Sequence, residues 1–218
     1  MDLTKSALVF FTSLMAGFMG GQVGCGGLLN LPILMLVGLN PLVAIGTNKF
    51  AAVFIVLISA KTFYQKHKLP LKKFSILAAA SLVGSIVGVF TLFSFPLDEM
   101  LLKKITVGIL LLVSFIIFYK QNLGLHDQEL TLSRKNFGLL IFFVFLISVY
   151  GGMFTIAMTT LFAMVFTLNK QSFAKSMSFA LALTFVVIFS STLFFIYYDL
   201  VNYHFAAVQA VGGTIGAG

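Results

Sequence analysis

Charged residues are scarce in this chain of 218 residues. They make up 9% of it, and 60% of the residues are hydrophobic, whereas a soluble globular domain carries roughly 25% charged residues. A mean hydropathy of +1.08 excludes an ordinary soluble domain. The composition therefore predicts a polytopic membrane protein, with the lipid bilayer as its solvent.

Acidic residues, cysteine and histidine are rarer still. No carboxylate falls deep in an apolar run, because Asp98, Glu99 and Asp199 stand at the ends of runs. An acidic proton relay or a carboxylate sodium site is therefore not expected, and coupling to protons or sodium stays open. The single Cys25 excludes an internal disulfide, and three scattered histidines predict no metal site. Without a converging nucleophile, base or metal set, we expect neither an enzyme nor a cofactor.

The basic excess, 14 Lys and Arg against 6 Asp and Glu, does not indicate a nucleic-acid partner. The basic residues cluster in short segments between apolar runs, above all in QKHKLPLKK at 65–73 and in the polar segment 120–135. Basic loops of this kind lie on the cytoplasmic side of membrane proteins. We therefore interpret them as determinants of topology.

Glycine and proline interrupt the first apolar run, 7–38. Residues 20–27 include five glycines, and Pro32 and Pro41 follow. Glycine costs about 1 kcal/mol and proline about 3 kcal/mol in a helix interior, so two half-length helices are predicted, at Ala7–Gly21 and Leu28–Val37. Broken backbone at membrane depth survives only inside protein or beside a wet cavity. Many transporters build a substrate site from such broken helices.

Most other apolar runs have the length of a membrane span, about 20 residues. These runs are Pro41–Tyr64, Lys72 to about Phe93, Leu97–Tyr119, Phe173–Tyr198 and a last run from about Asn202. A second interrupted run comes before Phe173, with Gly151–Gly152 between 136–150 and 157–168. The chain is therefore predicted to be all-α.

The order of the runs indicates an internal duplication. A shift of 130 residues places Gly21 on Gly151, and a shift of 128 places VGSIVG (83–88) on VGGTIG (211–216). We divide the chain into a first transmembrane repeat (1–119), a central polar loop (120–135) and a second repeat (136–218). The second repeat lacks a counterpart of 97–119, through truncation or loss of a span. Chance similarity between glycine-rich apolar helices is the alternative.

Two threadings of the interrupted runs are compatible with this duplication. If each run forms a hairpin with both ends on one side, the two repeats are inverted, and the basic segments 61–73, 120–135 and 170–175 lie inside. If each run crosses the membrane once, the repeats are parallel. The charge bias favours two inverted repeats, with broken or re-entrant helices at the start of each.

One candidate anion site lies at the first break. Gly24, Gly26 and Gly27 lead into the predicted half-helix, and Asn30 follows one turn later. Free amides and the positive end of a helix dipole favour an anion at such a position. Close helix packing through small residues is the alternative. For Cys25, a small residue tolerated at a tight turn is favoured over a reactive thiol.

Thr47, Asn48 and Lys49 form a second polar cluster. Lys49 lies about 12 Å along a helix from Pro41, and an ionisable residue at this depth indicates a functional site. Reach toward the outer headgroups is the alternative for this lysine. Together the hydroxyl, amide and ammonium suit an anionic, oxygen-rich group.

Hydroxyl groups of the second half complete the candidate site. They stand in places that face the polar residues of the first half, at Thr155, Thr159, Ser176 and Ser178. They either line the same cavity or bond back to their own helices.

The stretch GCGGLLNLPILMLVGLNPLVAIGTNKF resembles the first repeat of the TauE/SafE family, the sulfite exporters or 4-toluene sulfonate uptake permeases. The family pattern is roughly GGGGxxxxPxLxxxGxxPxxAxGTNK. The chain matches it at Gly24, Gly26, Gly27, Pro32, Gly38, Pro41, Ala44, Gly46, Thr47, Asn48 and Lys49. The second half resembles the other family repeat through Tyr150–Gly152, Ala174 and Val211–Gly216, so the resemblance covers nearly the whole chain.

This resemblance implies a secondary transporter of the inner membrane of bacteria or archaea. Its substrate would be a small anion such as sulfite, an organosulfonate, or a related sulfur-containing or carboxylate anion, moved by alternating access. Gly26 and Gly27 would offer amides, Thr47 and Asn48 hydrogen bonds, and Lys49 a neutralising charge. A homodimer stays open.

Departures from the family pattern support a second interpretation. Cys25 replaces a glycine, and Asn30 stands where a small serine-like residue is usual. The GxGTGS and ANTK-like segments of the second family repeat are replaced by residues 154–159 and 176–179, without a second lysine. The alternative function is therefore a channel-like or non-transporting membrane scaffold with an eroded second repeat.

Overall fold

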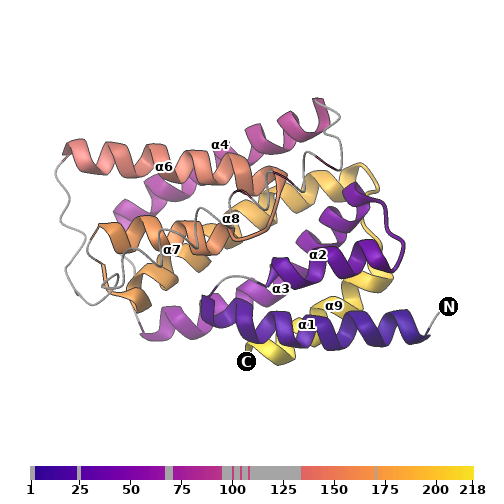
Figure 1. Ribbon diagram of the computed structural model, residues 1–218. Coiled ribbons are helices and arrows are strands. Elements are labelled where there is room, and N and C mark those ends of the chain that lie inside the picture. The colour runs from indigo at the N-terminus through magenta and orange to yellow at the C-terminus, as the bar shows by residue number, and fades with distance from the viewer. Residues whose placement is uncertain are drawn as a thin grey trace.

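The computed structural model describes residues 3–23, 26–66, 71–94, 134–169 and 171–218, together with the isolated positions 100, 104 and 108. Every regular element in these ranges is an α-helix (Figure 1). Apart from the isolated positions, the predicted span Leu97–Tyr119 lies outside the described residues, as does most of the central loop 120–135.

The helices follow the apolar runs of the sequence. In chain order they are α1 (Leu3–Val23), α2 (Gly27–Leu36), α3 (Pro41–Lys66), α4 (Leu71–Ser94), α6 (Arg134–Met153), α7 (Met158–Leu168), α8 (Phe173–Tyr197) and α9 (Tyr203–Ala217). By length and composition, five of them are able to cross a membrane, namely α1, α3, α4, α6 and α8. The prediction of an all-α, multi-pass membrane protein is confirmed.

The first break lies where the glycines predict it, but only one flanking helix is short. α2 has 10 residues, whereas α1 has 21 residues and is long enough to cross the bilayer. The prediction of a half-length first helix is therefore wrong. The glycines affect only the end of α1, because the residues before Gly20 form an uninterrupted apolar helix.

The second break lies later than predicted. α6 continues through Gly151 and Gly152 and ends at Met153, so this glycine pair does not break the helix. A Cβ atom on Gly152 would come within 2.3 Å of the Ser85 carbonyl oxygen of α4. Glycine is required here for the close approach of α4 and α6.

Two helix pairs pack through glycines in the same manner. The pair α1–α9 and the pair α4–α6 each bring glycine Cα atoms against backbone of the facing helix. The contacts correspond one by one: Gly212 with Phe10 and Gly216 with Leu14 in α1–α9, Gly84 with Phe145 and Gly88 with Val149 in α4–α6. In each case a Cβ atom would lie 2.0–2.7 Å from the partner's carbonyl oxygen. The partners advance together along both helices, so each pair runs parallel.

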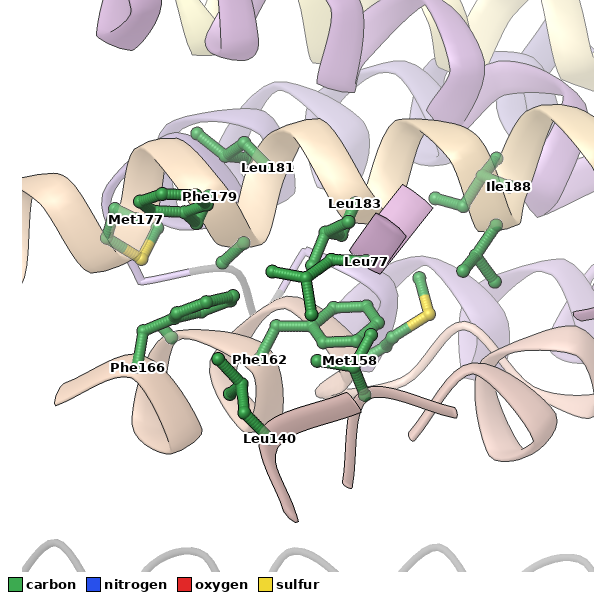
Figure 2. Packing of buried hydrophobic residues seen from close by; sticks show 14 residues of the cluster. Leu77, Leu140, Met158, Phe162, Phe166, Met177, Phe179, Leu181, Leu183 and Ile188 are labelled. Atoms are coloured by element: carbon green, nitrogen blue, oxygen red, sulfur yellow. The ribbon is translucent and has the colours of Figure 1, made fainter. Parts of the chain in front are cut away.

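The largest buried cluster lies where α8 meets α7, α6 and α4 (Figure 2). Phe162 and Phe166 of α7 are fully buried there, and the rings of Phe166 and Phe179 stack with centroids 4.7 Å apart. Leu140 of α6 and Leu77 of α4 also belong to the cluster. α7, too short to cross a bilayer, thus buries most of its surface against α8 and α6, and broken backbone at membrane depth needs such cover by protein.

Candidate functional site

The two breaks meet in the interior of the protein. Gly27, the first residue of α2, lies against the second break. A Cβ atom added to it would be 3.4 Å from the Thr155 carbonyl oxygen and 3.7 Å from Asn48 Nδ2. Gly26 is closer still to α1, since its Cβ atom would lie 2.7 Å from the Ala16 carbonyl oxygen. Glycine at these positions lets α1, α2 and the second break approach one another.

The second break is held by its own backbone and by Tyr150. Ala157 adopts a left-handed conformation with φ of 55°, which turns the chain into α7. The Tyr150 hydroxyl donates to the Ile156 carbonyl oxygen at 3.0 Å, and the Phe154 amide donates to the Tyr150 carbonyl oxygen at 2.7 Å. Among the described residues no side chain caps the N-terminus of α7 or of α2, so the amides of their first turns are available to another acceptor.

Removal of the Tyr150 hydroxyl is expected to loosen the second break. The variant Tyr150→Phe should lose about 1 kcal/mol of stability, because the Ile156 carbonyl loses its donor. Thermal unfolding in detergent measures this as a lowered midpoint. Tyr203→Phe is the matched control, because the Tyr203 side chain is half exposed and its hydroxyl makes no hydrogen bond to a described residue. An equal midpoint for both variants would show that this hydroxyl does not hold the break.

A cavity of about 50 Å³ lies between the two breaks. Helices α1, α2, α3, α7 and α8 contribute to its wall, together with the second break. Six of the predicted site residues line it: Gly26, Gly27, Asn30, Asn48, Thr155 and Thr159. The structure therefore brings the glycines of the first break and the hydroxyls of the second half to one place.

Asparagine amides and hydroxyl groups make up the polar part of this wall. Asn48 Oδ1 accepts from Gln209 Nε2 at 2.7 Å, and Asn30 Oδ1 accepts from Ser13 Oγ at 3.2 Å. Each of these bonds uses the amide oxygen, so the amide nitrogen is the atom that each asparagine has left to donate, in side chains that are only 2% (Asn48) and 5% (Asn30) exposed. The Thr155 hydroxyl is buried and has no partner in the part of the chain that the structure describes. No carboxylate belongs to the described lining.

Sequence reasoning missed three polar residues of this region. Thr184 lines the cavity and its hydroxyl bonds that of Thr159 at 3.1 Å, and Ser59 lines it while donating to its own helix. Gln209 holds Asn48 from behind. An amide in the apolar run of α9 is the same kind of signal as Asn30, so Gln209 could have been found. The two hydroxyls could not, because many serines and threonines occur in these helices.

Four predicted residues do not line the cavity. The Thr47 hydroxyl accepts from the backbone amide of Asn202 at 2.9 Å. The Ser176 hydroxyl is buried and bonds no described residue, and the Ser178 hydroxyl donates to the Ala174 carbonyl oxygen at 3.0 Å. The fourth is Lys49. Gly24 and Cys25 lie outside the described residues.

Lys49 is fully buried and ties α3 to the second half. Its Nζ donates to the Gly151 carbonyl oxygen at 2.7 Å and to Ser191 Oγ at 3.0 Å, and it lies 5.7 Å from the centre of the Phe195 ring. Gly151 is in the last turn of α6, where carbonyls lack partners within the helix and a cation complements the helix dipole. The alternative in which this lysine reaches the headgroups is therefore wrong.

The sequence of this chain is similar to a protein family and to several curated proteins. Residues 9–218 match the family described as "Sulfite exporter TauE/SafE". A "Probable membrane transporter protein" of Haemophilus influenzae is 30% identical over 62% of this chain and 52% of its own length. The "Probable membrane transporter protein ORF9" of a Sinorhizobium species is 28% identical over 68% and 55%, and YfcA of Escherichia coli, of the same printed description, is 27% identical over 96% and 77%.

The chain thus spans about half the length of the first two of these relatives. No solved structure shows significant similarity to it. The family match nevertheless covers both breaks, the cavity and the segment Gly46–Lys49. The chain belongs to the sulfite exporter TauE/SafE family.

Proposed function

We propose that this protein is a secondary transporter of the bacterial inner membrane that moves a small anion by alternating access. Sulfite, an organosulfonate, or a related sulfur-containing or carboxylate anion is the substrate class. The observation that carries this proposal is the cavity between the two breaks, whose wall includes two asparagine amides and the unpaired hydroxyl of Thr155. The names of the relatives, which describe probable membrane transporters, support the same activity.

The chemistry of the wall favours an anion. The Thr155 hydroxyl is buried without a partner among the described residues, and a buried polar group left unpaired costs roughly 1–3 kcal/mol. Asn30 and Asn48 accept from Ser13 and Gln209 with their amide oxygens, so their amide nitrogens are the atoms left to donate. An oxyanion in the cavity would accept from all three. The uncapped first turn of α2 adds partial positive charge, and Lys49 adds a positive charge one residue beyond Asn48.

The volume of the cavity favours a small substrate. About 50 Å³ is room for a few non-hydrogen atoms beyond a single water, whereas pockets for drug-sized ligands hold about 300 Å³ or more. A sulfite or sulfonate head group has the required size and presents three oxygen acceptors. A larger organic tail would need the wall between α1 and α3 to open.

The matched helix pairs support two inverted repeats and hence alternating access. In two such repeats α1 to α4 correspond to α6 to α9, so α1 corresponds to α6 and α9 to α4. The pair α1–α9 is then equivalent to the pair α6–α4, and both pairs make the same glycine contacts. In Figure 1, α1 and α9 run toward the left while α4 and α6 run toward the right, as inversion requires. Movement of one repeat against the other would expose the cavity to each side in turn.

Removal of the Thr155 hydroxyl tests this function. In the variant Thr155→Val an anion loses one charge-assisted hydrogen bond, worth about 1.5–3 kcal/mol. We therefore expect the sulfite concentration that gives half-maximal uptake to rise at least tenfold, measured in liposomes that contain the purified protein. Without an anion at this place, loss of an unpaired hydroxyl would leave uptake unchanged.

Thr192→Val is the matched control, because the Thr192 hydroxyl is also buried without a partner among the described residues but does not line the cavity. Its uptake should equal that of the wild type. Equal uptake by both variants would remove the cavity from the transport route. If the wild-type protein takes up none of sulfite, sulfonates and small carboxylates, the proposal fails and the membrane scaffold is favoured.

A further inference from the structure

Lys49 is buried in the interior without an acidic partner among the described residues. Its side chain is 0% exposed, and both of its hydrogen-bond acceptors, a carbonyl and a hydroxyl, are neutral. Asp199 is the one carboxylate in the described part of the chain, and it lies exposed in the turn after α8. Taking an ammonium out of water without a counter-ion costs several kcal/mol.

The hydrogen bonds of Lys49 are satisfied equally well by a neutral amine. An ammonium has three N–H donors, and the structure gives two of them acceptors, Gly151 O and Ser191 Oγ. A neutral amine has two N–H donors and a lone pair, so it keeps both bonds and leaves no donor unpaired. Loss of the proton therefore breaks neither contact, and the third proton is held only by the Phe195 ring.

Lys49 stands close to the substrate cavity without lining it. Its neighbour Asn48 forms part of the wall, and so does Ala52 one turn later. Its partner Ser191 donates to the Ile188 carbonyl oxygen at 3.2 Å, and Ile188 also lines the cavity. An anion in the cavity would thus lie near enough to stabilise the ammonium electrostatically, but not in contact with it.

The other titratable groups on the helices around Lys49 are engaged or remote. The Tyr150 hydroxyl donates to Ile156, the ring of Tyr203 packs on Phe50, and His204 bonds Ser6. The remaining lysines of these helices whose side chains are described are Lys5, Lys61 and Lys175, all near helix ends. α2 carries no titratable side chain.

From this arrangement we infer that Lys49 is the proton-binding site of a proton-coupled anion transporter. This inference rests on the proposed function. The neutral amine accepts one proton on Nζ when an anion enters the cavity, and the ammonium releases that proton when the anion leaves on the other side. Occupancy by the anion and protonation of Lys49 favour each other by the same factor, because the linkage is reciprocal. The coupled ion is then a proton and not sodium.

Proton movement during uptake of a fully ionised anion tests this inference. Sulfate, thiosulfate and methanesulfonate carry no proton of their own between pH 6 and pH 8, so any proton that enters is carried by the protein. In liposomes with a trapped pH dye, we expect one proton to enter per anion. We also expect the anion concentration that gives half-maximal uptake to rise about tenfold from pH 6 to pH 8, because Lys49 loses its proton and the anion loses a charged partner.

Two substitutions of Lys49 test whether this residue carries the transported proton. Lys49→Arg keeps the charge at every pH, so uptake should persist without pH dependence and without proton entry. Lys49→Met removes the charge, so uptake should be weak and also independent of pH. Lys61→Arg, at an exposed position near the end of α3, is the matched control and should retain the wild-type pH dependence.

The outcomes separate this inference from the proposed function. If the wild-type protein takes up the anion without proton entry, the role of Lys49 is overturned but anion transport is not. This measurement uses the wild-type protein alone and does not depend on the folding of a variant. Proton entry that persists in a folded Lys49→Arg or Lys49→Met protein also overturns it. Absence of uptake for every anion overturns both.

Discussion

Anion uptake is expected to fall at least 100-fold in the variant Asn48→Asp. The substitution preserves the shape of the side chain and the oxygen that accepts from Gln209 Nε2, but it replaces the amide nitrogen by a carboxylate oxygen. Like charges about 4 Å apart repel by about 4 kcal/mol at an effective dielectric constant of 20. That is close to a thousandfold in affinity, since each 1.36 kcal/mol is about tenfold. Uptake of sulfite into liposomes measures the effect.

The variant Asn40→Asp adds the same charge without touching the cavity. Asn40 is exposed before α3, and its Oδ1 accepts from the Leu42 amide at 3.0 Å. An aspartate caps a helix as well as an asparagine does, so both stability and uptake should stay at the wild-type level. Full uptake by Asn48→Asp would show that the anion does not pass this asparagine.

Thr47, Asn48 and Lys49 show which part of the site could be predicted from the sequence. The sequence identified this polar cluster at membrane depth, and the structure buries all three residues. It could not place all of them in one cavity, because consecutive residues on an α-helix point about 100° apart. Only Asn48 shares a stripe with Ala52 and Ser59 along the cavity. Helical geometry applied to the motif would have shown that at most one of the three faces it.

The glycines show why the breaks were only partly predictable. Glycine weakens a helix, but it also permits close packing against a second helix. Gly26 serves the first break and Gly152 serves packing against Ser85, and nothing within either local sequence distinguishes the two. Whether a glycine ends a helix or permits close packing depends on a facing helix that is remote in the chain. The amide of Gln209 is visible in the sequence, but its contact with Asn48 depends in the same way on a helix that is remote in the chain.

Severe destabilisation is expected for the variant Gly46→Ala. A Cβ atom on Gly46 would lie 2.1 Å from the Leu200 carbonyl oxygen and 2.7 Å from Phe195 Cδ1. Backbone cannot yield as a flexible side chain does, so the turn between α8 and α9 must move away from α3. Overpacking of this kind costs about 1–3 kcal/mol. Loss of the bond from the Asn202 amide to Thr47 adds about 1 kcal/mol.

Thermal unfolding in detergent distinguishes this clash from a general cost of alanine. Gly138→Ala is the matched control: it lies in α6 with nothing within 4 Å of the added Cβ atom, so its midpoint should equal or slightly exceed that of the wild type. A wild-type midpoint for Gly46→Ala would mean that the turn at Leu200 does not pack on α3. Phe195 and Leu200 both pack against Gly46 on this face of α3. The contact of Lys49 with the Phe195 ring would then also be in question.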